Sequence, residues 1–210
     1  MAHKNWTLEQ WDEVMWSDEM WVNPGTHRRV RVIRKIGEEE LYHSDCVEGR
    51  EQRKIGWMFW GEVSGKYSKG PYLFWNKKKC GNIGSKTYHE YTVPLIYEYI
   101  EQHTDIYLMQ DNCSGHAAKA TLEHMASIRI VPMYWPSCSP DLNPIETVWN
   151  VMKEYIHLHY SKSHCSHKKL KEQALEAWHA VPDSKIRELV HSMPECCAAV
   201  IEAKGWHTKF

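Results

Sequence analysis

Apolar positions along the chain follow two periods, one typical of strands and one typical of helices. Runs of β-branched and aromatic residues bounded by turn residues predict strands over 13–22, 54–64, 70–75, 106–110 and 129–135. Helical spacing predicts helices over 85–102, 117–127, 168–180 and 184–204, and a further helix that begins after Asn143. Pro94 should kink the first of these helices or restart it.

The order of these elements predicts the fold class. The second and third strands flank a turn that begins at Gly65, so they should form an antiparallel hairpin. Strands and helices then alternate, which predicts parallel strands joined by helical crossovers. No linker or repeat divides the sequence, and we therefore expect one α/β domain over 1–210.

Composition narrows the class of protein. Apolar residues make up 42% and charged residues 25% of the chain, which indicates a globular protein. The net charge of −1 gives no global signal for nucleic acid, so any DNA contact must come from local patches. Seven cysteines without a CxxC pair favour reduced thiols and an intracellular setting. No apolar run approaches a membrane span, and residues 1–5 have no apolar core for a signal peptide.

Three acidic residues occupy comparable places in the predicted elements. Asp18 lies in the first strand, where a buried carboxylate is costly unless it is paired or bound to a metal. Its neighbour Glu19 points the other way, so one of the two should face solvent. Asp111 ends a later strand. Glu146 opens a helix, and in the alternative interpretation it is a capping-box residue that bonds to the amide of Asn143.

Adjacent parallel strands could bring Asp18 and Asp111 side by side, with Glu146 over them, because ligands collect at the carboxyl ends of such strands. Three carboxylates this close repel one another and need cations. Mg²⁺ suits oxygen ligands, and a pair of such ions can support phosphoryl displacement.

The motifs around these acids resemble those of the catalytic domain of mariner-type (Tc-like) DNA transposases of the DDE superfamily. Residues 16–19, residues 109–112 with His116, and residues 139–146 with Trp149 resemble its three motifs. The 34 residues between Asp111 and Glu146 match the spacing typical of the Tc-like branch. The resemblance runs from about Trp6 to Phe210.

The resemblance implies a ribonuclease H-like fold, with a mixed five-stranded sheet flanked by helices. It implies that Asp18, Asp111 and Glu146 hold two Mg²⁺ or Mn²⁺ ions. The implied reaction is cleavage of DNA at transposon ends, followed by joining of the 3′-hydroxyl to target DNA. Asn112 and His116 would lie near the site, around the metal ligands or on DNA.

Further implications concern assembly and location. Residues 22–53 would form a clamp-like loop that bridges subunits of a homodimer acting in the nucleus. Within this loop Arg28, Arg29 and Arg31 either contact DNA or a partner, or belong to a solvated segment. Family members carry an N-terminal helix-turn-helix region, whereas Met1 stands almost directly before the first motif. The chain would therefore lack that region.

Two alternatives compete with this interpretation. The chain could be a truncated or domesticated transposase remnant that acts as a non-catalytic DNA- or protein-interaction module. A zinc site could instead form near 157–167 from a group of histidines and one cysteine, namely His157, His159, His164, Cys165 and His167. Their spacing fits no common tetrahedral pattern, and surface histidines explain it better. Trp149 and Trp178 are expected to be core residues.

Overall fold

One mixed sheet of four strands organises the part of the chain that the computed structural model describes, which is residues 3, 5–24, 56–82, 84–113, 116–136, 139–160, 165–206 and 208. The strands are β1 (Val14–Val22), β2 (Trp57–Ser64), β3 (Ser68–Trp75) and β4 (Tyr107–Met109), in the order β3-β2-β1-β4. β2 pairs antiparallel with both β1 and β3, whereas β4 pairs parallel with β1. The predicted hairpin and parallel pair are confirmed.

Helices occupy most of the remaining described chain. Before β4 they are α1 (Leu8–Asp12), α2 (Lys77–Cys80), α3 (Ser85–Tyr91) and α4 (Val93–Gln102). After β4 they are α5 (Lys119–Ser127), a 3-10 turn (Pro140–Leu142), α6 (Ile145–Tyr160), α7 (His167–Ala180), α8 (Asp183–His191) and α9 (Met193–Glu202). The restart predicted at Pro94 is confirmed, because this proline lies in the first turn of α4.

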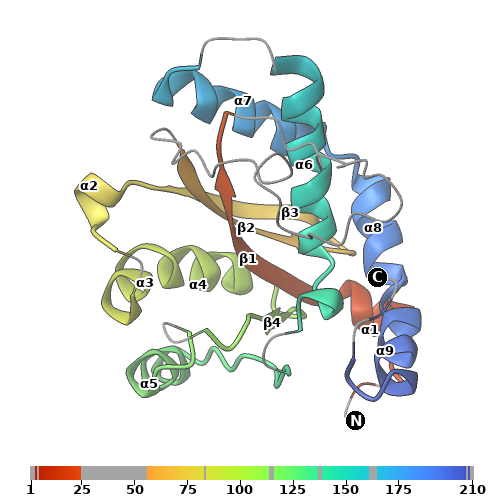
Figure 1. Cartoon of the computed structure of the whole chain (residues 1–210). Coiled ribbons are helices and arrows are strands. Elements are labelled where there is room, and N and C mark those ends of the chain that lie inside the picture. The colour runs from red at the N-terminus through yellow and green to blue at the C-terminus, as the bar shows by residue number, and fades with distance from the viewer. Residues whose placement is uncertain are drawn as a thin grey trace, which may run out of the picture.

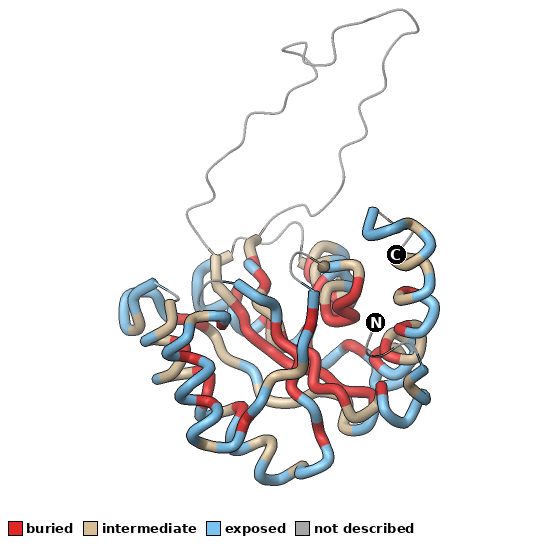
Figure 2. Tube along the Cα trace, turned by 90° about the horizontal axis from the view of Figure 1, so that it is seen from below, coloured by how far each residue is buried: buried red, intermediate tan, exposed pale blue. Residues whose placement is uncertain are grey.

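Helices cover both faces of the sheet (Figure 1). Trp16, Phe59 and Met109 pack in one cluster with residues of α6, α7 and α8. Met15, Trp60 and Leu108 alternate with them and pack in a second cluster with α3, α4 and α5. Figure 2 shows the buried positions concentrated along the strands, between these layers. Side chains on both faces of β1, except Trp21, are therefore largely shielded from solvent.

Two predicted elements differ from the structure. Residues 129–135 form no regular strand, although the amide of Met133 donates to the carbonyl oxygen of Leu108 at 2.8 Å. Pro132 lacks the N–H group that a ladder requires. The predicted final helix is two helices, because the chain turns at Ser192 and Pro194 begins α9. The fifth strand is thus not shown within the described residues.

The predicted clamp-like loop at about 22–53 lies outside the described residues from position 25 onward, and so do Arg28, Arg29 and Arg31. In the described part of the chain, no helix combines the length and the apolar character that crossing a membrane requires. The argument for a site therefore rests on the sheet and on the helices around it.

Candidate active site

Asp18 is placed by the alternation of β1. It shares a face with Trp16 and Met20, which pack toward α6, and its partner across the antiparallel pair is Gly61. Because Gly61 has no side chain, the neighbouring strand leaves room on this face. Asp18 is therefore held partly buried, with its carboxylate on the side of the sheet that α6 covers.

Asp111 is placed by the parallel pair of β1 and β4. Trp16 pairs with Met109, so Asp18 and Asp111 both follow the paired position by two residues. The hydroxyl of Ser17 donates to the carbonyl oxygen of Met109 at 3.0 Å, which ties the two strands together at this point. The prediction that parallel pairing brings the two aspartates to one edge is confirmed.

Glu146 is placed by the turn that precedes α6. The amide of Asn143 donates to the carbonyl oxygen of Pro140 at 2.9 Å, and the amide of Glu146 donates to the carbonyl oxygen of Asn143 at 3.1 Å. Oδ1 of Asn143 accepts a hydrogen bond of 3.4 Å from the amide of Ile145. Asn143 thus caps α6 as predicted, but its amide is used by Pro140, which argues against the capping-box interpretation of Glu146.

The three acids line one cavity of about 270 Å³. Its other walls are Met109, Asn112, Cys113, Trp135, Pro136, Ser139, Pro140 and Asn143. A second cavity of about 320 Å³ shares Pro140, Asn143 and Glu146 with it and extends to α8 and α9. The two cavities together form a depression that extends beyond the three acids toward α8 and α9.

The electrostatics of this cavity favour a cation. Burial raises the pKa of Asp18 to about 8, and the charges of Glu146, Glu19 and Asp111 act in the same direction against a hydrogen bond from the backbone of Glu19. None of the described residues that line the cavity is basic. Carboxylate oxygens are the ligands that Mg²⁺ and Mn²⁺ prefer. The donor set therefore fits a divalent metal.

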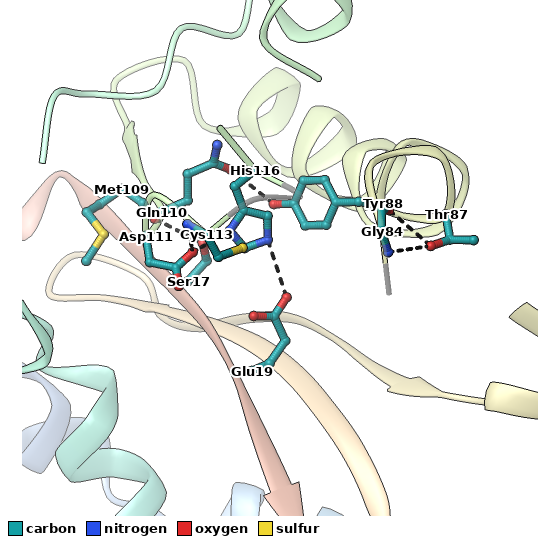
Figure 3. A network of polar contacts seen from close by, with 10 residues as sticks. All are labelled: Ser17, Glu19, Gly84, Thr87, Tyr88, Met109, Gln110, Asp111, Cys113 and His116. Atoms are coloured by element: carbon teal, nitrogen blue, oxygen red, sulfur yellow. Dashed lines mark hydrogen bonds and ion pairs between the residues drawn. The ribbon is translucent and has the colours of Figure 1, made fainter. Parts of the chain in front are cut away.

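The imidazole of His116 orients the carboxylate of Asp111 (Figure 3). Nδ1 of His116 lies 2.5 Å from Oδ1 of Asp111, and Nε2 lies 3.5 Å from Oε1 of Glu19. Burial tends to lower the pKa of His116, but hydrogen bonds to Asp111, Cys113 and Glu19 raise it to about 12. The hydrogen bond from His116 lowers the pKa of Asp111. The pair is thus an ion pair within the protein.

The placement of the Glu19 side chain contradicts the prediction that one of the two adjacent acids faces solvent. Its side chain is 17% exposed and lies against His116, on the face of β1 opposite to Asp18. The prediction was wrong because α3, α4 and α5 cover this second face. No pattern in the sequence indicates this contact, since Glu19 and His116 are far apart in the chain.

Of the other residues singled out from the sequence, two lie beside Asp111 and two lie in the core. Asn112 donates from Nδ2 to the carbonyl oxygen of Trp135 at 2.6 Å and lines the cavity beside Asp111. His116 is 3% exposed and lies beside Asp111. Trp149 and Trp178 are buried in the core, as predicted.

The zinc alternative near 157–167 has no support in the described residues, from which His164 is missing. Within those residues, one group of three or more histidine, cysteine or acidic side chains has its ligand atoms close enough for a metal ion. That group is Asp111, Cys113 and His116.

A mixed sheet covered by helices, with three carboxylates in a cavity beyond its parallel strands, defines a ribonuclease H-like domain with an acidic site. The chain belongs to the DDE superfamily endonuclease family, whose sequence model matches residues 13–171. This match includes Asp18, Asp111 and Glu146.

Two curated relatives are transposases of the nematode Caenorhabditis briggsae. The chain is 38% identical to the transposable element Tcb2 transposase over 221 residues and 29% identical to the Tcb1 transposase over 212 residues. The matches cover 100% and 99% of this chain, and 74% of each relative. The family assignment thus holds along the whole chain.

Solved structures with the same fold include complexes of the Mos1 mariner transposase. The paired end complex with Mn has a TM-score of 0.73 at 15% identity, covering 99% of this chain and 60% of the other. The Mos1 catalytic domain with Raltegravir and Mn has a TM-score of 0.68 at 14% identity, covering 95% and 86%. This likeness supports the fold. The chain spans about three fifths of the Mos1 chain in the first of these structures.

Proposed function

We propose that this chain is the metal-dependent catalytic domain of a transposase, which cuts DNA at transposon ends and joins the freed 3′-hydroxyl to target DNA. The observation that carries the proposal is the meeting of Asp18, Asp111 and Glu146 at one cavity. The three residues come from β1, from the segment after β4 and from the first turn of α6. Their convergence in a DDE superfamily endonuclease domain fits polynucleotidyl transfer.

The proposed metal ligands are these three carboxylates, with two Mg²⁺ or Mn²⁺ ions. Such ions stabilise the attacking and leaving oxygens of a phosphoryl displacement and lower the pKa of water. Asp18 offers a carboxylate that the sheet holds nearly rigid, and Asp111 offers one that His116 orients. Glu146 stands on a helix whose buried stripe fixes it against the sheet. These supports would limit the movement of the proposed ligands before DNA binds.

The proposed partners follow from the relatives. The solved structures of Mos1 include a paired end complex and a strand transfer complex. We propose that this chain likewise acts on transposon-end and target DNA, as a homodimer, in the nucleus. The elongated depression formed by the two cavities that share Glu146 offers room for a strand beside the acids.

Nicking of supercoiled plasmid DNA in Mn²⁺ tests the proposal. Glu146→Gln keeps the shape of the side chain and removes one ligand charge, so nicking should fall by at least about 100-fold, in the range of a lost electrostatic contact in catalysis. Glu154→Gln makes the same change on the exposed side of α6 and serves as the matched control. The control should nick like the wild type.

Equal nicking by wild type and Glu146→Gln would rule out this active site. Failure of the wild type to nick at any Mn²⁺ concentration, together with a lack of triad-dependent Mg²⁺ binding in calorimetry, would favour the non-catalytic interaction module instead. Saturable Mg²⁺ binding that Glu146→Gln weakens would support the proposed ligand set.

A further inference from the structure

A mixed group of potential metal ligands adjoins the triad and is not explained by it. It consists of the Asp111 carboxylate, the Cys113 thiol and the His116 imidazole, and one ligand atom of each lies within 4.8 Å of the others. Cys113 and Asp111 are open to solvent on one side, whereas His116 is buried. The group therefore has a rigid inner member and an outer side from which an ion can enter.

Two backbone amides tie these three residues together. The amide of Cys113 donates to Oδ1 of Asp111 at 3.2 Å, and the amide of His116 donates to the carbonyl oxygen of Cys113 at 3.1 Å. These bonds hold the three residues close together, and Figure 3 shows their side chains side by side. Their proximity is thus built into the local chain path.

The chemistry of this group differs from that of the triad. Thiolate sulfur and imidazole nitrogen are poor ligands for Mg²⁺, which prefers oxygen, but they are the common ligands of Zn²⁺. Zinc sites with three protein ligands keep a fourth position for water. Asp111, Cys113 and His116 supply one oxygen, one sulfur and one nitrogen, which is a set suited to Zn²⁺.

The far side of His116 has the arrangement found behind zinc-bound imidazoles. If Nδ1 binds the ion, Nε2 faces Oε1 of Glu19 at 3.5 Å. Histidine ligands of metals almost always donate their other N–H to a carboxylate, a carbonyl oxygen or a water, which orients the ring. Glu19 is 17% exposed and has no part in the triad cavity. It is therefore placed to orient His116.

We propose that Asp111, Cys113 and His116 form a Zn²⁺ site, with Glu19 as the residue that orients His116. Zn²⁺ would replace the proton between Nδ1 of His116 and Oδ1 of Asp111. Bonds of about 2.1 Å require these two atoms to separate by roughly 1 Å. Asp111, whose side chain is 49% exposed, has room for this movement.

One consequence of this site rests on the proposed function. Because Asp111 would belong to both ligand sets, Zn²⁺ bound by Cys113 and His116 would draw its carboxylate away from Asp18 and Glu146. Zn²⁺ would then inhibit the Mg²⁺-dependent reaction through Cys113, a residue that the triad does not need as a ligand.

Cobalt spectroscopy tests the site without any use of activity. Co²⁺ added to the full chain should give a saturable sulfur-to-metal charge-transfer band in the near ultraviolet, which Zn²⁺ abolishes. Cys113→Ala and His116→Gln should each lose the band. Cys80→Ala, the same change at a partly buried free thiol elsewhere in the chain, should keep it. Because Cys113 is exposed, its substitution leaves the core intact, and circular dichroism verifies the folding of each variant.

Two further measurements sharpen the test. Glu19→Gln should weaken Zn²⁺ binding, measured by competition with a chromophoric chelator, by about 10- to 100-fold. In plasmid nicking with Mg²⁺, added Zn²⁺ should lower the rate of wild type and of Cys80→Ala. It should not lower the rate of Cys113→Ala.

A Co²⁺ band that survives in Cys113→Ala, or the absence of a saturable band in the folded wild type, would overturn the site. If the band depends on Cys113 but no chain nicks DNA, the zinc site stands and the proposed function fails. If all chains nick equally with and without Zn²⁺ while the band depends on Cys113, the shared use of Asp111 is wrong.

Discussion

Glu62 is a buried carboxyl group on the face of the sheet opposite to the triad. It is 0% exposed, and neither of its oxygens has a hydrogen-bond partner among the described residues. A Cβ added at Gly70 would lie 2.8 Å from its Oε1, so the backbone of β3 closes directly over it. Burial raises the pKa of Glu62 well above its ordinary value. Burial therefore favours the neutral form of this side chain in the folded protein.

Glu62→Gln should change how stability depends on pH. A raised carboxyl pKa means that the folded state holds the proton more tightly than the unfolded state. This contribution is complete below about pH 4.5 and is lost as pH rises toward the folded pKa. Glu62→Gln has no such carboxyl group, so its stability does not decrease in this way as pH rises. Its free energy of unfolding relative to wild type should therefore rise with pH, by at most about 1.4 kcal/mol per unit.

Urea unfolding of both proteins between pH 5 and pH 8 measures this difference. Glu98→Gln, at an exposed position of α4, is the control and should show a constant difference from wild type. A constant difference for Glu62→Gln as well would mean that Glu62 is ionised in the folded state.

The candidate site could be predicted at the level of its acids but not of their supports. Asp18, Asp111 and Glu146 could be grouped because each stands at a recognisable place in a predicted element. Glu19 and Cys113 could not be assigned a role in this way. The contact of Glu19 with His116 depends on the parallel pairing of β1 with β4 and on the helix layer that covers Glu19. The contact of Cys113 with His116 is local, but its ligand character appears only when the side chains are placed.

At the scale of elements, two tryptophans pack α6 and α7 against the sheet. The ring atoms Cη2 of Trp149 and Trp178 would lie 3.2 Å and 3.4 Å from a Cβ added at Gly61. Phe59 packs edge-on against both indole rings. Since Gly61 pairs with Asp18 and Trp149 belongs to the helix of Glu146, this contact sets the distance between two of the acids.

Gly61→Ala should therefore disturb both packing and site. The added methyl group must push the indole rings outward by a few tenths of an ångström, which should cost about 1 to 3 kcal/mol of unfolding free energy. Gly84→Ala is the control, because a Cβ there meets nothing within 4 Å. Thermal unfolding compares the two variants. Equal unfolding temperatures would show that the indole layer yields freely.

Elements were predictable where local chemistry agrees with packing. Asn143 and Pro144 start a helix by their own geometry, and the structure has that helix. Residues 129–135 are apolar enough for a strand, but Pro132 lacks the donor that strand pairing would use. In this segment the pattern of apolar residues predicts which positions are buried. It does not predict whether the backbone forms the hydrogen bonds of a strand.

At the scale of the whole molecule, the triad joins segments from the first strand, the centre of the chain and the last third. A bound divalent cation would therefore stabilise the entire fold, because the unfolded chain cannot hold these acids together. The parallel pairing of β1 with β4, which brings Asp18 and Asp111 together, joins segments far apart in the sequence. The motifs indicate this contact, and the folded chain shows it.

Asp18→Asn should weaken the stabilisation of the fold by metal. In EDTA the variant should be more stable than wild type by about 1 to 3 kcal/mol, because wild type must either bury the Asp18 charge beside Glu146 and Asp111 or take up a proton on folding. Mn²⁺ at about 100 times its Kd should add roughly 2.7 kcal/mol to wild type and much less to the variant. Thermal unfolding with and without Mn²⁺ measures both. Equal responses to Mn²⁺ would remove Asp18 from the ligand set.

The alternation of β1 has a consequence for how such a domain can diverge. Asp18 and Glu19 are successive residues, yet one faces the cavity and the other faces His116. Deleting or inserting a single residue between Val14 and Asp18 would exchange the two acids between the faces of the sheet. The length of this strand is therefore constrained more tightly than the identity of its apolar residues, and indels should be tolerated only outside it.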